Sequence, residues 1–562
     1  MGERAPEPAP VPPRRRGWAP RILLAVSLAV AVWAALPRST WDALEVTTWL
    51  QAESLVGDFD WRWDREDRIR FEEWGRRNRE VLLPEPLVVP GKAGDRFDAP
   101  LIPSLLLTPA ALIGGPGTGL VWQILLLGAA LSLVLQTSGP RSGGVTPGLL
   151  ALLVLGSAAF PNLFHLWPDV LLLGLVVTGL ALAWRRPGSE SSEELPDVWE
   201  GPWGESPGRF LLRWSSAGLC LGMAATARPF LLPLLLPLLV PVPRDRRVTA
   251  RWLAGGTFAL PLVVSLGWDL LRGSFTVPAL PELDPNLWLW AGLDLVAGRH
   301  LGLIPYFLPM ILILVLWSGE EGRWSLGVAG LLGLAALVVW RPFDLAGNPW
   351  TFGNRVFLGL YPVFWFAVGR APRIATLVGF GAVAGALVWP MWLGPGTVPD
   401  PHEPPGRWVA PYLRPWLPVE TTQRALIDRI PKVRSGGVDA FLLSPRARRG
   451  DETGEIWITG SESVELLLRS PNPVVGLRLE ASELAGAELA LRGAELSQTV
   501  FRPDGSSGFR ITFEGEGRTH PTERGGPAAH FRRFRARWPH APARPVRVAV
   551  GGLETAIPDM EE

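Results

Sequence analysis

Carboxylate side chains cluster just beyond the first apolar segment of the chain. The stretch STWDALEVTTWLQAESLVGDFDWRWD, residues 39–64, holds six carboxylates interleaved with aromatic residues. A carboxylate can act as a general base toward a hydroxyl group in a transfer reaction. Asp42 and Glu45 lie nearest to the apolar segment 22–36, so they are the first candidates for such a base. The competing interpretation is that both side chains are simply solvated where the chain leaves a membrane.

Further polar side chains recur at the ends of later apolar segments. They are His165, Asp169, Arg228, Arg299, His300 and Arg355. Charged groups at the edge of a membrane are costly and often mark a functional site. Arginine holds a phosphate through two parallel hydrogen bonds, so a cavity lined by charges of both signs suits transfer from a phosphate-activated donor.

Spacing alone indicates an outward-facing polar cavity and leaves its function open. The candidates for that cavity are Asp42, Glu45, Asp169, Arg228 and Arg355, with His165, Arg299 and His300 as additional candidates. Structural roles compete with each assignment. An acid after a proline caps a helix, an arginine at a helix end reaches for lipid headgroups, and a histidine there can be merely interfacial.

The composition indicates a membrane protein with many helices. Only 19% of the 562 residues are charged, and the mean hydropathy of the chain is positive. Apolar runs recur, and placing the basic clusters on the cytoplasmic side predicts about eleven transmembrane helices, with the N-terminus inside and the C-terminus outside. The expected helices are 22–36, 118–137, 147–160, 169–184, 210–226, 230–242, 252–271, 301–317, 325–340, 355–369 and 374–393.

Three other segments complete the membrane region, which is expected to end at residue 394. Residues 1–21 are expected to be a disordered, basic cytoplasmic segment, and the alternative to a retained first helix is a cleaved signal peptide. Residues 37–100 form the outer loop that carries the acidic stretch. Residues 101–115 hold two prolines and are expected to lie at the outer interface, or to dip into the bilayer, without crossing it.

The composition changes in the last third of the chain. Residues 395–450 are rich in proline and are expected to be a linker region, with a helical patch at 421–429. Residues 451–562 contain short alternating runs, namely EIWITG, SVELLLRS, VVGLRLEAS, AELALRG, GFRITFEG and RPVRVAVGG. Regularly spaced runs of this kind predict an all-β, sandwich-like domain, which the topology places outside the membrane.

Other classes of site find no support in the sequence. The single cysteine, Cys220, lies in an apolar run, so an intramolecular disulfide is excluded. The six histidines lack the spacing of a metal site, and the chain has neither a P-loop nor a GxGxxG that follows a strand. No cofactor is therefore identified, a divalent metal is left open, and no nucleic acid is expected as a partner.

Five stretches, taken in chain order, resemble the GT-C superfamily of polytopic membrane glycosyltransferases. They are LEVTTWLQAESLVGDFDW (44–61), FDAPLIPSLLLTPAALIGG (97–115), FPNLFHLWPDVLLLGL (160–175), GLCLGMAATARPFLLP (218–233), and the pair AGRHLGLIPYFLP (297–309) and GNPWTFGNRVFLGLYPVF (347–364). Together they are most similar to bacterial relatives of protein mannosyltransferases and aminoarabinose transferases. The resemblance implies transfer of a sugar from a polyprenyl-phosphate donor at the outer face of the bacterial cytoplasmic membrane.

The resemblance makes the acidic residue of the first outer loop the expected catalytic base. Aligned on the alanine and serine of the motif, the family's acidic pair falls on Leu44 and Glu45. Aligned on the Gly-Asp dipeptide instead, the pair falls on Asp42 and Ala43. Either Asp42 or Glu45 therefore serves as the base, or the chain is a divergent member with reduced or lost activity.

The same resemblance extends to the other site residues. Asp169 keeps the pairing of proline and acid in the family's next outer loop, and Arg228 and Arg355 are the implied contacts of the donor phosphate. Asp98 stands where the family has a histidine. The implied partners are a lipid-linked sugar donor, membrane lipids, and a glycan, lipid or protein acceptor.

Two other functions stay open. A chain that kept the GT-C-like fold and lost its base would be a catalytically inactive membrane scaffold in glycan assembly. A transporter would also combine intramembrane charges with helices broken by proline or glycine. The hydropathy pattern, however, shows no internal repeat, and a large outer β-domain is unusual in a transporter.

Overall fold

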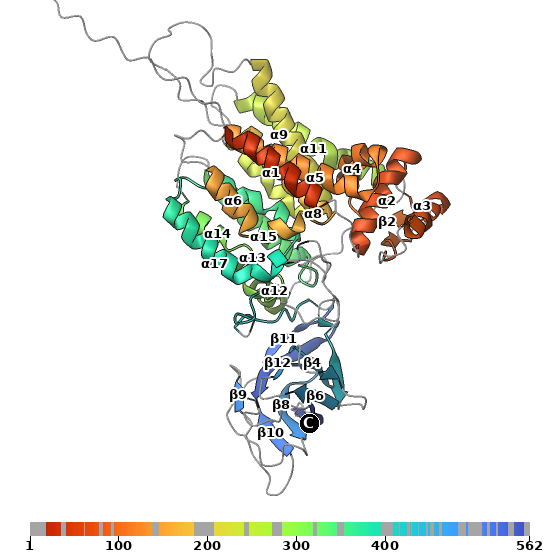
Figure 1. Ribbon diagram of the computed structural model, residues 1–562, viewed down its shortest axis with the longest axis vertical. Coiled ribbons are helices and arrows are strands. Elements are labelled where there is room, and N and C mark those ends of the chain that lie inside the picture. The colour runs from red at the N-terminus through yellow and green to blue at the C-terminus, as the bar shows by residue number, and fades with distance from the viewer. Residues whose placement is uncertain are drawn as a thin grey trace, which may run out of the picture.

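The computed structural model of the chain has a helical region followed by a β-sheet region (Figure 1). The residues that it describes are 18–34, 41–60, 62–77, 83–90, 95–137, 145–184, 207–240, 247–271, 284–317, 323–345, 353–393, 395, 409–414, 416–423, 427–428, 430–435, 438–444, 448–449, 455–459, 464–480, 490–492, 508–513, 517–523, 526–537 and 545–555. Most of the basic N-terminal segment, the arginines near 244 and the prolines near 400 lie outside the described residues.

The described residues of the helical region form α-helices of very different lengths and two 3-10 turns. The α-helices are α1 (Trp18–Ala34), α2 (Ala43–Gly57), α3 (Arg65–Arg77), α4 (Leu101–Ile113), α5 (Pro116–Thr137), α6 (Pro147–Leu155), α7 (Ala159–Asn162), α8 (Pro168–Ala183), α9 (Pro207–Ala227), α10 (Leu235–Leu239), α11 (Arg247–Leu271), α12 (Pro285–Ala297), α13 (Leu303–Tyr306), α14 (Pro309–Val315), α15 (Arg323–Trp340), α16 (Tyr361–Phe366) and α17 (Ile374–Leu393). The 3-10 turns are η1 (Pro229–Leu234) and η3 (Val356–Gly359).

Among the described residues, four helices are long and apolar enough to cross a membrane. They are α5, α11, α15 and α17. They account for four of the expected spans and are compatible with a membrane protein, but they do not confirm a count of about eleven. Three other expected spans, 230–242, 301–317 and 355–369, are each divided into two short pieces. Each of the three contains proline, which removes a main-chain donor and clashes with the preceding turn.

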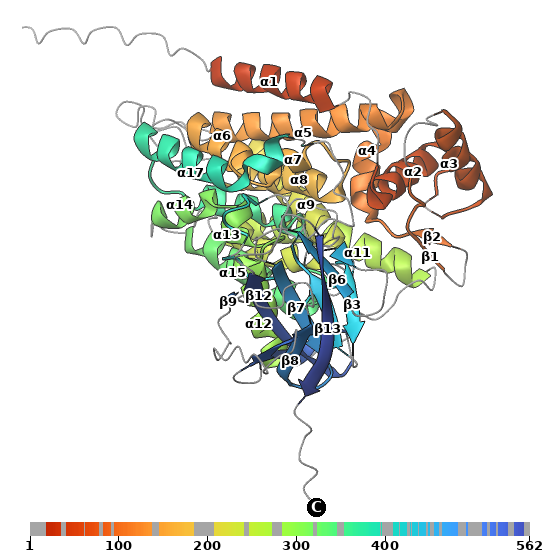
Figure 2. The ribbon, with the colours of Figure 1, turned by 60° about the horizontal axis from the view of Figure 1, so that its bottom comes forward.

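Small residues bring neighbouring helices close together. Gly218 and Gly222 lie one turn apart on α9, and a side chain at either position would overlap the main chain of α11. Spacing small residues by four positions is a common way to pack membrane helices. Ser27 of α1 likewise packs on Gly128 of α5, and the two helices run side by side (Figure 2).

The described part of the segment between α1 and α4 is folded rather than an open loop. Helices α2 and α3 project together from one side of the helical region (Figures 1 and 2). Helix α2 packs against α4, and the short strands β1 (Val88–Val89) and β2 (Arg96–Phe97) pair between α3 and α4. The expected helix at 101–115 corresponds to α4, so the residues of this region are held in fixed positions around α2.

The β-sheet region is confirmed, and each of the six alternating runs contains a strand. The strands are β3 (Lys432–Ser435), β4 (Val438–Leu442), β5 (Arg448–Arg449), β6 (Glu455–Thr459), β7 (Val464–Ser470), β8 (Val474–Glu480), β9 (Ala490–Arg492), β10 (Gly508–Thr512), β11 (Arg518–Pro521), β12 (Ala528–Arg537) and β13 (Pro545–Thr555). The described strands form two antiparallel sheets, β10-β8-β13-β6-β5 and β11-β12-β7-β4-β3, with β9 beside β12. Leu466 and Leu468 of β7 share one core with Leu477 and Leu479 of β8.

The sheets begin earlier in the chain than the alternating runs indicated. Strands β3 and β4 lie within residues 395–450, which the composition assigned to a linker, and β4 pairs with β7. Every side chain of β4 is buried, so it lacks the alternation that identified the other strands. At the expected helical patch 421–429, residues 421–422 form a turn, and residues 424–426 and 429 lie outside the described part.

Candidate functional site

Helix α2 begins with a capping box built by the two candidates for the catalytic base. The Asp42 carboxylate accepts a hydrogen bond from the Leu44 N–H (2.8 Å), and Glu45 Oε2 accepts one from the Asp42 N–H (2.9 Å). This arrangement satisfies main-chain donors that the first turn of a helix leaves unpaired. Asp42 and Glu45 are only 4% and 0% exposed. Neither is a solvated group at the edge of a membrane helix.

The Glu45 carboxylate also reaches the segment that precedes α8. Glu45 Oε1 accepts a hydrogen bond from the Leu166 N–H (2.7 Å) and lies 3.4 Å from His165 Nδ1. His165 Nε2 lies 3.2 Å from the carbonyl oxygen of Pro395, and the imidazole ring stacks on Trp167 with 4.2 Å between centroids. Glu45 therefore fastens the start of α2 to the segment that carries His165.

Asp169 holds two arginines that come from distant parts of the chain. Arg228 Nε and Nη2 donate hydrogen bonds to Asp169 Oδ1 (2.9 Å) and Oδ2 (3.2 Å), and Arg355 Nε lies 3.4 Å from Oδ2. Asp169 follows Pro168 in the first turn of α8, where an acid also suits the helix dipole. The N-cap of α8 is Trp167, without a side-chain cap hydrogen bond, so the contacts shown for the Asp169 carboxylate are those to the arginines.

Interruptions between helical elements bring both arginines to this carboxylate. Arg228 has an extended main chain (φ −141°) between α9 and η1. Gly353 has φ +63°, and a Cβ at this position would lie 2.7 Å from Tyr306 Cγ, so the turn requires glycine. Arg355 follows that turn directly before η3, with its side chain 3% exposed. Both guanidinium groups are therefore positioned by interruptions of the helices and not by continuous helix.

Trp167 contacts both His165, which lies beside Glu45, and Arg355, which lies beside Asp169. Its indole ring stacks on His165, and Arg355 Cζ lies 5.4 Å from the ring centroid. A cation over an aromatic ring is stabilised by about 0.5–2 kcal/mol. The sequence did not single out Trp167, because a tryptophan near the end of an apolar segment is typical of the membrane interface.

Six of the eight predicted site residues therefore meet in one buried group, which we call the acid–arginine cluster. Its members are Asp42, Glu45, His165, Asp169, Arg228 and Arg355. Asp98 and Asp344 add negative charge to the electrostatic field at Arg228.

The two acids of the capping box differ in their electrostatic surroundings. Burial raises the pKa of Asp42, an effect that the charge of Arg355 opposes and that of Glu45 reinforces. A carboxylate with a raised pKa is a stronger base. Glu45 instead accepts an N–H hydrogen bond on each of its two oxygens, so both oxygens are already engaged in structural contacts. Asp42 is therefore the better placed of the two to accept a proton.

Arg299 and His300 lie at the junction of the helical and β-sheet regions, where they form a second group. Arg299 Nη2 donates a hydrogen bond to Glu465 Oε1 on β7 (2.8 Å), and the His300 N–H donates one to Glu420. We call this group the junction cluster and define it as Asp294, Arg299, His300, Glu420, Glu465, Arg518 and Arg533. Sequence analysis singled out Arg299 and His300 but not their partners, because Glu420, Glu465, Arg518 and Arg533 lie beyond residue 394.

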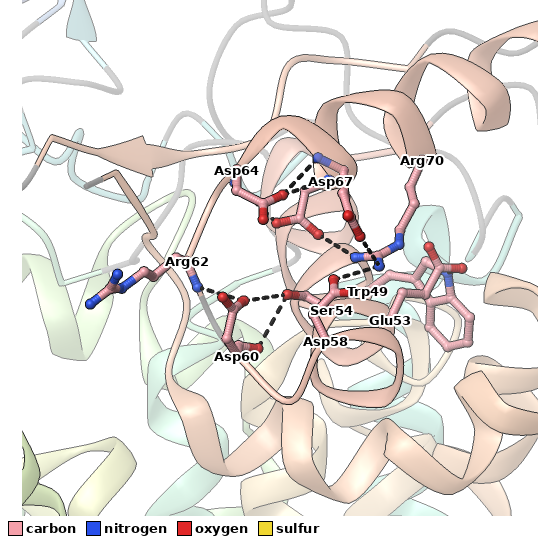
Figure 3. A network of polar contacts seen from close by, with 10 residues as sticks. Trp49, Glu53, Ser54, Asp58, Asp60, Arg62, Asp64, Asp67 and Arg70 are labelled. Atoms are coloured by element: carbon pink, nitrogen blue, oxygen red, sulfur yellow. Dashed lines mark hydrogen bonds and ion pairs between the residues drawn. The ribbon is translucent and has the colours of Figure 1, made fainter. Parts of the chain in front are cut away.

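The remaining acids of residues 39–64 belong to a network at the other end of α2 (Figure 3). Arg70 of α3 pairs with Asp58 (2.5 Å) and with Asp67 (2.7 Å). Burial raises the pKa of Asp67 to about 6. These contacts hold α3 against α2, so the acidic stretch has one end in the acid–arginine cluster and another in a structural network.

The acid–arginine cluster can take a proton and hold an anion. Asp42 supplies the carboxylate for proton transfer, and Arg228 and Arg355 supply fixed cations. In the described part of the chain, no group of three or more His, Cys, Asp or Glu side chains could hold a metal ion. No protein-family model and no curated protein matches the chain. The chemistry of the cluster is therefore the basis on which a function is inferred.

Proposed function

We propose that this protein is a divergent membrane glycosyltransferase of the GT-C kind. It transfers a sugar from a polyprenyl-phosphate-linked donor to an acceptor at the outer face of the bacterial cytoplasmic membrane. The observation that carries the proposal is the convergence of Arg228 and Arg355 on Asp169, in the cluster that contains the buried Asp42. Paired guanidinium groups suit a phosphate, and a basic carboxylate suits an acceptor hydroxyl.

Each member has a role in this reaction. Asp42 takes the proton of the acceptor hydroxyl as the hydroxyl oxygen attacks the anomeric carbon of the sugar. The bond between that carbon and the phosphate oxygen breaks with inversion, and the lipid phosphate leaves with the electron pair. Arg228 and Arg355 stabilise the developing negative charge, because fixed cations in a water-poor site act most strongly where charge appears. Asp169 orients both arginines.

The proposed topology has about eleven spans, with paired short elements such as α13 and α14 crossing the bilayer together. The N-terminus is then cytoplasmic, and the β-sheet region lies outside. Phe59, which is 87% exposed, and the exposed Thr249 are expected on opposite sides. A membrane-impermeant thiol reagent should label Phe59→Cys and not Thr249→Cys, each in a Cys220→Ala background. Labelling of both from one side contradicts the topology.

The transfer reaction can be tested with a radiolabelled sugar on polyprenyl phosphate. Wild type, Asp42→Asn, Glu45→Gln and the double variant are compared in membranes. Asparagine caps a helix as well as aspartate does, so Asp42→Asn keeps the start of α2 and removes the base. Loss of a general base slows a reaction by about 100- to 10,000-fold. We expect a loss of this size in Asp42→Asn and a smaller one in Glu45→Gln.

Asp58→Asn is the matched control, since it changes an acid at the other end of α2. It should keep transfer near the wild-type rate. Equal incorporation in Asp42→Asn, Asp58→Asn and wild type would remove Asp42 from the reaction.

A second candidate function is a catalytically inactive scaffold in glycan assembly. The observation in its favour is the capping box, which gives both Asp42 and Glu45 a structural role. Under this alternative, wild type transfers no sugar from any polyprenyl-phosphate donor, and Asp42→Asn changes neither stability nor binding of envelope glycan. Donor-dependent transfer by wild type decides against it.

A further inference from the structure

We propose that His165 is an imidazolium cation held by Glu45 and that it positions the Asp42 base. The role in positioning rests on the proposed function, because it concerns the base of that reaction. The proton state rests on contacts alone. His165 is fully buried, its ring lies against Trp167, and its carbonyl oxygen accepts a hydrogen bond from Gln123 Nε2 (2.8 Å). The Gln123 bond holds the main chain of His165, Trp167 covers one face of the ring, and the two ring nitrogens contact Pro395 and Glu45.

The contact at Nε2 requires a hydrogen on that nitrogen. His165 Nε2 lies 3.2 Å from the carbonyl oxygen of Pro395. A carbonyl oxygen only accepts hydrogen bonds, so Nε2 must be the donor. A neutral imidazole carries one hydrogen on its two nitrogens, and in that form Nδ1 would present a lone pair.

The contact at Nδ1 then favours a second hydrogen. His165 Nδ1 lies 3.4 Å from Glu45 Oε1. Glu45 accepts N–H hydrogen bonds from Leu166 (2.7 Å) and from Asp42 (2.9 Å), and these bonds favour its ionised form. A lone pair at Nδ1 would face a carboxylate oxygen and be repelled by it. A proton at Nδ1 turns this repulsion into an ion pair, whose strength grows in a buried environment.

The charges of the acid–arginine cluster agree with this assignment. Asp42 and Glu45 approach His165 from α2, Asp169 lies at the start of α8, and Arg355 lies over Trp167. The cluster holds three carboxylates and the two guanidinium groups of Arg228 and Arg355, and Asp98 and Asp344 add negative charge at Arg228. An imidazolium at position 165 reduces this excess of negative charge, which lowers the cost of burying the group.

The consequence for the proposed reaction is a chain of contacts from His165 to the base. His165 and the Leu166 N–H hold Glu45, and Glu45 holds the main chain of Asp42 through the capping box. When the pH rises and His165 loses its proton, the ion pair is lost and Asp42 is less well positioned. Transfer should then fall on the alkaline side, while protonation of Asp42 lowers transfer on the acid side.

Nitrogen NMR of histidine-labelled, full-length protein in detergent tests the proton state directly. An imidazolium gives two similar resonances from protonated nitrogens, whereas a neutral ring gives two widely separated ones. At neutral pH one imidazolium pair should disappear in His165→Gln and persist in His530→Gln, a histidine of β12. In Glu45→Gln the pair should change to the neutral pattern. A neutral pattern for His165 in wild type overturns the proposal.

Transfer kinetics test the positioning role. His165→Gln keeps a donor for Pro395 and removes the charge. A displacement of a reacting group by about 1 Å can slow a reaction about 100-fold. We expect a loss of that order in kcat, little change in the donor KM, and loss of the alkaline limb of the pH profile. An unchanged alkaline limb in His165→Gln overturns the positioning role.

The two readouts separate the possible failures. If wild type transfers no sugar, the proposed function and the positioning role fail together, while NMR still decides whether His165 is an imidazolium. If His165→Gln does not fold, the wild-type spectrum and that of Glu45→Gln decide the same point.

Discussion

The acid–arginine cluster and the junction cluster both bury carboxylates against arginines from distant segments. They differ in the groups that accept the hydrogen bonds of their arginines. In the junction, Glu420 accepts hydrogen bonds from the main-chain N–H groups of His300 and Leu301, and Arg533 Nη1 donates to the Leu417 carbonyl oxygen (2.7 Å). In the acid–arginine cluster, the hydrogen bonds of Arg228 run to the side chain of Asp169.

This difference separates a structural ion network from one suited to a ligand. Arg299 and Arg533 of the junction reach the Leu417 carbonyl oxygen as well as Glu465, and an incoming anion would have to compete with those contacts. A guanidinium group paired with one carboxylate can rotate or share its donors with a phosphate. The following variants test this contrast.

The largest effect is expected from Asp169→Asn. This variant leaves Arg228 and Arg355 buried without their shared carboxylate. Removing one partner of a buried ion pair destabilises a protein by about 3–5 kcal/mol. We expect a loss of thermal stability of that order, measured by unfolding in detergent, together with loss of sugar transfer. Asp344→Asn is the control, because its ion pair with Arg341 is on the surface, and such pairs contribute about 0–1 kcal/mol. Equal destabilisation by both variants would contradict the burial argument.

Glu465→Gln should have a smaller effect and a different one. It weakens the contacts of Arg299 (2.8 Å) and Arg533 (2.5 Å), and hydrogen bonds to charged groups contribute about 1.5–3 kcal/mol. Limited proteolysis should release the β-sheet region more readily, while sugar transfer persists. Asp439→Asn is the control, since Asp439 pairs with Arg434 (2.8 Å) and Arg469 (2.7 Å) within the sheet region. Loss of transfer in Glu465→Gln would remove the distinction between the clusters.

Gly353→Ala tests whether the turn before Arg355 serves the acid–arginine cluster. Residues other than glycine are strained by about 1–3 kcal/mol at such a main-chain conformation, and the new Cβ would lie 2.7 Å from Tyr306 Cγ. We expect a large loss in the rate of sugar transfer, because the strain displaces Arg355. The loss in the free energy of unfolding should not exceed the strain energy. Gly174→Ala on α8 is the control, as no atom lies within 4 Å of its Cβ. Normal transfer in Gly353→Ala would show that the position of this arginine is not critical.

The smallest effect is a pH dependence of the junction. Burial raises the pKa of Asp294 to about 7, an effect that Arg518 opposes. The folded protein therefore holds this proton more tightly than the unfolded chain does. The stabilisation is complete at low pH and is lost as the pH rises through about 7. Unfolding measured from pH 5 to 9 should show this loss in wild type and not in Asp294→Asn. An equal loss of stability with pH in wild type and in Asp294→Asn would show that Asp294 is not the group responsible.

The sequence alone led to most of the candidate site. Charged residues beside apolar segments are uncommon, so Asp169, Arg228 and Arg355 were recognisable from their surroundings. Arg299 and His300 satisfied the same criterion but lie in the junction cluster. Topology assigns a residue to a side of the membrane and does not tell which neighbours it meets there. Glu465 and Glu420, which hold those residues, lie in segments that the apolar pattern does not reach.

The fold shows the same limits at particular elements. Helices α5, α11, α15 and α17 follow from long apolar runs, and β7 and β8 follow from alternation. Helix α3 was not expected, because its sequence is polar, and its contacts with α2 come from the network around Arg70.

The sequence by itself determined which segments are apolar enough for a membrane, which segments carry charge, and those strands whose residues alternate, because hydropathy and alternation are local properties of the chain. Only the tertiary structure decided that Glu45 meets His165 and that Asp169 lies between Arg228 and Arg355. These contacts join residues far apart in sequence, and they depend on how helices pack and where prolines and glycines interrupt them. The choice between Asp42 and Glu45 likewise came from burial and hydrogen bonds, which no spacing of residues contains.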